Sequence, residues 1–142
     1  MKQKIHMPAV LASAAARFTI GAVWTPLLFA GAWIEYTGWT QAQEEIAQDR
    51  MALTFAVAFF SYVVQACVLA MVVDLMNARS VIRGAWTGVL VWLGFTLVIL
   101  LQDSLFELRP LGLFGIKAGY ELVSLVVMGA ILAVWRKRPV AE

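Results

Sequence analysis

The sequence predicts an all-α integral membrane protein, a bundle of four transmembrane helices with both termini in the cytoplasm. Two observations support this prediction: the composition and the length of the apolar segments. Of the 142 residues, 62% are hydrophobic and 14% are charged. Soluble domains contain about 45–50% apolar and about 25% charged residues. A chain this short has too much surface to hide such an apolar excess in a globular core, so we expect lipid to surround it.

Four apolar segments are long enough to cross a bilayer, whose hydrocarbon core requires about 20 helical residues. They cover approximately residues 9–34, 51–73, 84–106 and 112–135. None shows the alternation expected of a barrel strand, whereas helices satisfy their own backbone hydrogen bonds in lipid. No repeat, low-complexity tract or linker divides the chain, so we treat residues 1–142 as a single transmembrane domain.

The first segment contains Pro26. A proline inside a helix removes a hydrogen bond and clashes with the preceding turn, so we expect a kink about one turn before it. A packing kink is favoured over a functional hinge. The segment is too long for the apolar core of a signal peptide and has no cleavage-like ending, so we expect it to be retained.

The one sizeable loop covers residues 37–50. Within it, Thr40 is followed three residues later by Gln43, which is the pattern of a capping box. We therefore expect a short interfacial helix that leads into the second span. The loop is too short to form a separate soluble domain.

The distribution of basic residues predicts how the chain is oriented in the membrane. One side of the predicted membrane collects Lys2, Lys4, Arg79, Arg83, Arg136, Lys137 and Arg138. The other side has only Arg50 and Arg109. Cytoplasmic loops carry an excess of Lys and Arg, so both termini and the 74–83 loop are assigned to the cytoplasm.

Several ionisable side chains lie inside the predicted spans, where each costs about 2.5–3.5 kcal/mol on insertion scales. With a rise of about 1.5 Å per residue, Asp103 and Lys117 lie at a similar depth on antiparallel helices. Lys117 and Glu121 are four residues apart on one helical face, and the long side chain of Arg17 can reach Glu121. We predict a polar intramembrane seam of Arg17, Asp103, Lys117 and Glu121 that faces the bundle interior. The alternative is purely structural pairing, or extension of Arg17 and Lys117 toward the two interfaces.

Small residues four apart let membrane helices approach closely. Gly84 with Gly88, and Gly115 with Gly119, have this spacing. They predict tight packing between the third and fourth spans, or against a partner protein.

Metal and nucleic-acid binding are not predicted. The single cysteine, Cys67, and the single histidine, His6, provide neither an internal disulfide nor a set of metal ligands. The net charge is +2 and the basic residues are spread along the chain, which is unlike a nucleic-acid-binding surface. No cofactor is predicted, although contact with lipid or pigment is compatible with the sequence.

Two stretches carry a resemblance to a known family. The first is GAVWTPLLFAGAWIEYTG, at 21–38, and the second combines WLGF, at 92–95, with LFELRPLGLFGIKAGYELVSLVVMGAILAVW, at 105–135. Together they resemble the bacterial domain of unknown function 1761 family. The resemblance implies a small multi-helix protein of the bacterial cytoplasmic (inner) membrane, with no assigned activity. It also implies that the outer turn of Glu107, Arg109 and Pro110 belongs to a shared architecture.

The sequence departs from the family pattern at IKAGYE, where the family is expected to have INAGY followed by a less acidic residue. Roles for Lys117 and Glu121 therefore come from this sequence alone. Three classes of function stay open. A non-catalytic accessory or scaffolding subunit, packed against other membrane proteins, pigments or lipids, is favoured. The alternative is a transporter or channel for a small solute or ion, formed by a homo-oligomer and using the polar seam, although no inverted repeat is visible. An enzyme is disfavoured because no His, Cys or Ser is arranged with a base.

Overall fold

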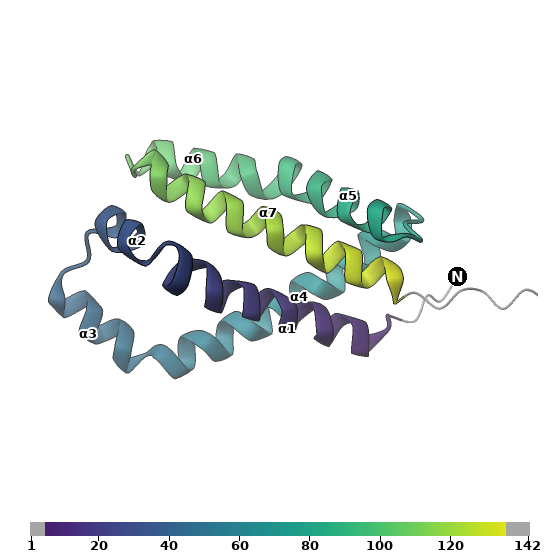
Figure 1. Ribbon diagram of the computed structural model, residues 1–142, viewed down its shortest axis with the longest axis horizontal. Coiled ribbons are helices and arrows are strands. Elements are labelled where there is room, and N and C mark those ends of the chain that lie inside the picture. The colour runs from purple at the N-terminus through teal and green to yellow at the C-terminus, as the bar shows by residue number, and fades with distance from the viewer. Residues whose placement is uncertain (1–4, 136–142) are drawn as a thin grey trace, which may run out of the picture.

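The computed structural model describes residues 5–135, and every regular element in that range is helical. Four helical stretches are long and apolar enough to cross a membrane: Met7–Leu28, Met51–Leu75, Val81–Phe106 and Leu111–Val134. Successive spans run in opposite directions (Figure 1). Residues 5 and 135 therefore lie at the same end of the molecule as the 76–80 turn, and the 107–110 turn lies at the opposite end. The predicted all-α class is confirmed, and so are four helical stretches that are long and apolar enough to cross a membrane.

The first predicted segment, 9–34, is not one helix. The elements are α1 (Met7–Val23), the π-helical turn η1 (Trp24–Leu28) and α2 (Ala30–Thr37). Pro26 lies inside η1 and has no N–H to donate, so a wider turn replaces regular helix there. Phe29, with φ −128° and ψ 17°, leaves the helical region and separates η1 from α2. The distortion surrounds the proline instead of preceding it by one turn.

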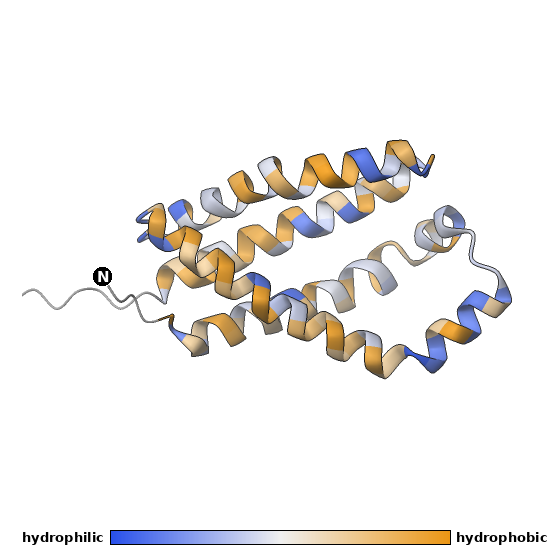
Figure 2. Cartoon of the chain, turned by 180° about the vertical axis from the view of Figure 1, so that it is seen from behind, coloured by the Kyte–Doolittle hydropathy of each residue, from blue (hydrophilic) through white to orange (hydrophobic). Residues whose placement is uncertain are grey.

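The short helix predicted in the loop is α3 (Gln41–Asp49). Its capping box is present: the backbone N–H of Gln43 donates to Thr40 Oγ1 at 3.4 Å, and the backbone N–H of Thr40 donates to Gln43 Oε1 at 2.9 Å. Arg50 alone separates α3 from α4 (Met51–Leu75), so this helix leads directly into the second span. Figure 2 shows the contrast between the hydrophilic α3 and the largely hydrophobic long helices.

The last helix is the most enclosed span. The third span consists of α5 (Val81–Val91), the π-helical segment η2 (Trp92–Leu97) and α6 (Val98–Phe106), and the fourth is α7 (Leu111–Val134). In the most apolar 18-residue stretch of α7, 44% is buried inside the protein, whereas the corresponding share is 17% in the second span and in the third. The reason is that α7 packs against α5, α1 and α4.

The contact between α5 and α7 is made through glycine. A Cβ on Gly84 would overlap the backbone carbonyl of Gly129, and a Cβ on Gly88 would overlap the backbone of Leu125. Glycine at these positions therefore lets the two helix backbones touch. The tight packing predicted from Gly84 and Gly88 is confirmed, with Gly129 as its counterpart on α7.

The second glycine pair has a different arrangement. A Cβ on Gly119 would lie 3.0 Å from the indole of Trp24, so this glycine accommodates a side chain of η1. A Cβ on Gly115 would meet nothing within 4 Å, and Gly115 is exposed. Gly115 and Gly119 therefore do not form a second helix-to-helix contact within residues 5–135.

We expect the substitution Gly88→Ala to lower the free energy of unfolding in detergent by about 1–3 kcal/mol, because the new methyl group would force α5 and α7 apart. Gly115→Ala is the matched control. It adds the same methyl group to open space, and the gain in helix propensity is expected to leave stability unchanged or raise it by up to about 1 kcal/mol. Thermal or denaturant unfolding of both variants measures the effect. Equal stability of the two variants would contradict the role given to the glycine contact.

Candidate functional site

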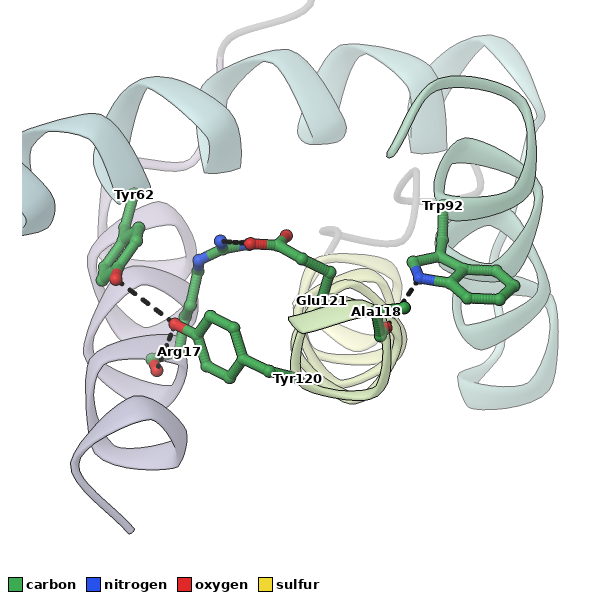
Figure 3. A network of polar contacts seen from close by, with 6 residues as sticks. All are labelled: Arg17, Tyr62, Trp92, Ala118, Tyr120 and Glu121. Atoms are coloured by element: carbon green, nitrogen blue, oxygen red, sulfur yellow. Dashed lines mark hydrogen bonds and ion pairs between the residues drawn. The ribbon is translucent and has the colours of Figure 1, made fainter. Parts of the chain in front are cut away.

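Arg17 is the one charged side chain that is buried among residues 5–135. It extends from α1, and its Nη2 donates to Oε1 of Glu121 on α7 at 2.6 Å (Figure 3). The side chain of Arg17 is 4% exposed and that of Glu121 is 19% exposed. This ion pair, predicted from the depths of the two residues, joins the first and fourth spans.

Two tyrosine rings complete the surroundings of the guanidinium. The Cζ atom of Arg17 lies 4.5 Å from the ring centre of Tyr62 on α4 and 5.2 Å from that of Tyr120 on α7. Both distances are within the range of a cation–π interaction. The hydroxyl of Tyr120 lies 3.3 Å from the hydroxyl of Tyr62 and 3.5 Å from the backbone oxygen of Arg17. One guanidinium thus holds α1, α4 and α7 together.

Polar atoms continue along the contact between α1 and α7. Ser13 lies one turn before Arg17 on α1, and Ser124 lies one turn after Tyr120 on α7. Because Arg17 is level with Glu121 on antiparallel helices, Ser13 and Ser124 also lie at one level. Both serines are fully buried. Their hydroxyl oxygens, together with Nε and Nη1 of Arg17, have no hydrogen-bond partner among the described residues.

The row of polar groups that runs from Arg17 and Glu121 to Ser13 and Ser124 ends at the apolar core. One turn beyond the two serines, Val10 on α1 and Met128 on α7 are completely buried, and both belong to the main hydrophobic cluster. The seam is therefore closed toward the end of the molecule that holds residues 5 and 135.

Two tryptophans bind the backbone of α7 on either side of Lys117. The indole Nε1 of Trp24 donates to the carbonyl oxygen of Ile116 at 3.0 Å, and that of Trp92 donates to the carbonyl oxygen of Ala118 at 2.9 Å. Figure 3 shows that Trp92 approaches α7 from the side opposite to Arg17. Each tryptophan is the first residue of a π-helical segment. Sequence reasoning missed these contacts, although a tryptophan placed within a span, away from its ends, was an available signal.

Lys117 lies beside the Arg17–Glu121 pair but outside it. Its side chain lines a cavity of about 280 Å³ together with Glu121, Tyr120 and residues of η1, α2 and α6. Within residues 5–135 it forms no ion pair, either with Glu121 on its own helix or with Asp103. Two charged side chains therefore line the cavity: Glu121, whose charge is paired with that of Arg17, and Lys117, which is a separate cation.

Asp103 does not face the bundle interior, and this corrects the prediction for that residue. It is exposed on α6, whereas the next residue, Ser104, is buried. Adjacent residues of a helix point about 100° apart, so the rotation that turns Ser104 inward turns Asp103 outward. The predicted seam thus keeps Arg17, Lys117 and Glu121.

The outer turn is separate from this site. The side chains of Glu107 and Arg109 are ion-paired and half exposed, and Pro110 is the N-cap of α7. Leu108 has a positive φ of 54°. The backbone N–H of Arg109 donates to the carbonyl oxygen of Ser104 at 2.9 Å, which gives the turn the geometry of a Schellman motif. These residues end one helix and start the next.

The described residues contain no group of three or more His, Cys, Asp or Glu side chains that could hold a metal ion. The groups that the site offers are an ammonium, a carboxylate shared with a guanidinium, and hydroxyls. Such groups can form ionic and hydrogen-bond contacts.

We expect Glu121→Gln to lower the free energy of unfolding by about 3–5 kcal/mol, because the substitution leaves a buried guanidinium without its counter-charge. The matched control is Glu107→Gln, which breaks an exposed pair worth at most about 1 kcal/mol. In the double variant Arg17→Met with Glu121→Leu, both charges are gone, and we expect most of the lost stability to return. Unfolding in detergent, followed by circular dichroism, measures all three. A Glu121→Gln protein as stable as the control would refute the structural role of the pair.

Residues 8–133 match the family described as "Protein of unknown function (DUF1761)". No curated protein and no solved structure matches the chain. The matched region covers nearly all of the chain and includes the four candidate membrane spans except for their outermost residues, Met7 and Val134. The protein therefore belongs to the DUF1761 family.

Proposed function

We propose that the protein is a non-catalytic accessory or scaffolding subunit of the bacterial cytoplasmic membrane, which packs against another membrane protein. The observation that carries this proposal is the apolar surface around the outer turn. Phe106 and Leu108 are 88% and 90% exposed there. Lipid chains cover apolar side chains in the middle of a span, but these two lie at the end of α6 and in the turn that follows it. Exposed apolar groups outside the lipid chains are typical of protein interaction sites.

The start of α7 extends this surface. Leu111 is exposed, and Gly115, one turn further along the same face, is exposed with open space where a Cβ would be. An exposed glycine on a membrane helix permits the close approach of a second helix. We name Phe106, Leu108, Leu111 and Gly115 the outer apolar surface and propose it as the docking face.

We further propose that residues 5 and 135 and the 76–80 turn lie on the cytoplasmic side. Arg79 in the 76–80 turn and Arg83 just after it support this orientation. The other basic residues that the sequence prediction counts on this side, Lys2, Lys4, Arg136, Lys137 and Arg138, lie outside the described residues. The outer apolar surface then lies at the periplasmic face of the membrane.

A transport function is the second candidate, and the polar seam of Arg17, Lys117 and Glu121 favours it. Intramembrane charges often mark the path of an ion or solute. The fully buried Val10 and Met128 argue against an open path, because the seam ends on them. A transport cycle would have to separate α1 from α7 at these two residues.

The orientation can be tested by labelling single cysteines in intact cells. In a Cys67→Ser background, we expect a membrane-impermeant maleimide to label Thr40→Cys, whereas Ser80→Cys is labelled only after the membrane is opened. Both positions lie outside the four candidate spans, so both cysteines are chemically accessible on their own side. The reverse labelling pattern would invert the orientation.

The subunit role can be tested by native mass spectrometry of the protein extracted gently from its own membrane. We expect a complex of fixed stoichiometry with another membrane protein. We expect Phe106→Ser combined with Leu108→Ser to remove that partner, because the double substitution makes the docking face polar. The control is Ile82→Ser, which changes an apolar side chain of 71% exposure at the opposite end of the third span. A monomer would refute the subunit role, and a pure homo-oligomer would favour transport instead.

A further inference from the structure

The cavity beside α7 combines apolar walls with a single unpaired cation. Its volume is about 280 Å³, and η1, α2, α6 and α7 all contribute to its lining: Trp24, Trp33, Leu100, Lys117, Tyr120 and Glu121. Ligand sites are typically lined by apolar and aromatic side chains with a few polar groups that orient the ligand. The cavity has this character and lies close to the smallest volume usual for such sites.

The charges in its wall do not balance. Glu121 is bound to Arg17 at 2.6 Å, so these two charges neutralise each other. Lys117 has no ion-pair partner among residues 5–135 and therefore contributes an uncompensated positive charge. A cation in apolar surroundings is costly unless an anion pairs with it. A ligand with one negative charge would complete the site.

The depth of the cavity restricts the kind of anion. Leu111–Val134 is 24 residues long, which corresponds to about 36 Å of helix against about 30 Å of hydrocarbon. Lys117 follows Leu111 by six residues, or about 9 Å. Its backbone is therefore about 6 Å inside the hydrocarbon layer, and its side chain can extend toward the interface. An amphiphile can bring an anionic head to this level while its chain stays in lipid, whereas a free inorganic anion would have to leave water completely.

We propose that this cavity binds a single-chain, monoanionic amphiphile, a long-chain carboxylate. The ammonium of Lys117 pairs with the carboxylate, and the indoles of Trp24 and Trp33 line the first part of the chain. The cavity volume of about 280 Å³ lies near the lower end for ligand sites, which favours a compact carboxylate head over a glycerophosphate. The Arg17–Glu121 pair forms the polar wall behind the head group and keeps Glu121 from pairing with Lys117. The site does not depend on whether the protein has a partner subunit.

Binding can be measured through the fluorescence of the two tryptophans that line the cavity, Trp24 and Trp33. We would titrate the full-length protein, in an uncharged detergent, with stearate brominated on its chain, because bromine quenches indole fluorescence on contact. We expect saturable quenching that the unbrominated acid reverses by competition. We expect Trp33→Phe to reduce the quenched fraction and Trp135→Phe, which changes the opposite end of the protein, to leave the saturable component in place.

The charge of Lys117 is tested by three variants. Lys117→Gln should weaken binding about tenfold or more, as expected for the loss of a charge-assisted hydrogen bond. Arg109→Gln also removes one cation from the outer half of the protein, but outside the cavity, and should bind as the unchanged protein does. Lys117→Arg keeps the charge and should retain binding. It therefore preserves the test if Lys117→Gln fails to fold, which circular dichroism would detect.

Two further ligands decide the nature of the head group. The methyl ester of the same brominated acid has an identical chain without the charge, and we expect it to give no saturable quenching. Brominated phosphatidylglycerol carries a monoanionic phosphate on two chains, and we expect it to quench without saturation. Equal binding of acid and ester, saturable binding of the phospholipid alone, or unchanged affinity in a folded Lys117→Gln protein would each overturn the proposal.

Discussion

A buried guanidinium is the constraint on which the arrangement of three helices depends. Arg17 is buried, so its charge has to be met by protein groups. Glu121 supplies the counter-charge at 2.6 Å, and the rings of Tyr62 and Tyr120 cover the guanidinium at 4.5 and 5.2 Å. These groups come from α1, α4 and α7, so the three helices can approach one another only in a register that brings them to one level. Sliding α1 by one residue would shift the pair by about 1.5 Å.

The two sides of α7 are held by different physical interactions. On the side of α5, Gly84, Gly88 and Gly129 allow the two backbones to touch, so dispersion forces act over a long contact. On the side of α1, the contact is polar and contains the ion pair of Arg17. Trp24 and Trp92 add hydrogen bonds to the carbonyl oxygens on either side of Lys117. These bonds stabilise the packing, because a buried indole N–H without a partner is costly.

This arrangement also determines which charged side chain has no ion-pair partner among residues 5–135. If Glu121 paired with Lys117, four residues away on the same helix, Arg17 would be buried without a counter-charge. Its pairing with Arg17 instead leaves the ammonium of Lys117 in the wall of a cavity. The seam thus has a structural part, which is neutral and buried, and a part that faces the cavity and carries charge. Both the proposed docking face and the proposed ligand site lie toward the same end of α7.

The sequence by itself predicted the all-α class, the four long apolar helices and the position of each residue along them. Composition and segment length predicted four helices that are long and apolar enough to cross a membrane, and the Thr40–Gln43 pattern predicted the capping box of α3. Counting residues along the helices predicted that the long side chain of Arg17 reaches Glu121 from a level nearer the end that holds the termini, and the structure shows that these two side chains pair. Only the tertiary structure decided the rotation of each helix about its axis, which turns Ser104 inward and Asp103 outward. In lipid all faces of a span can be apolar, so the sequence pattern contains little information about which face meets protein, and packing against the neighbouring helices makes that choice.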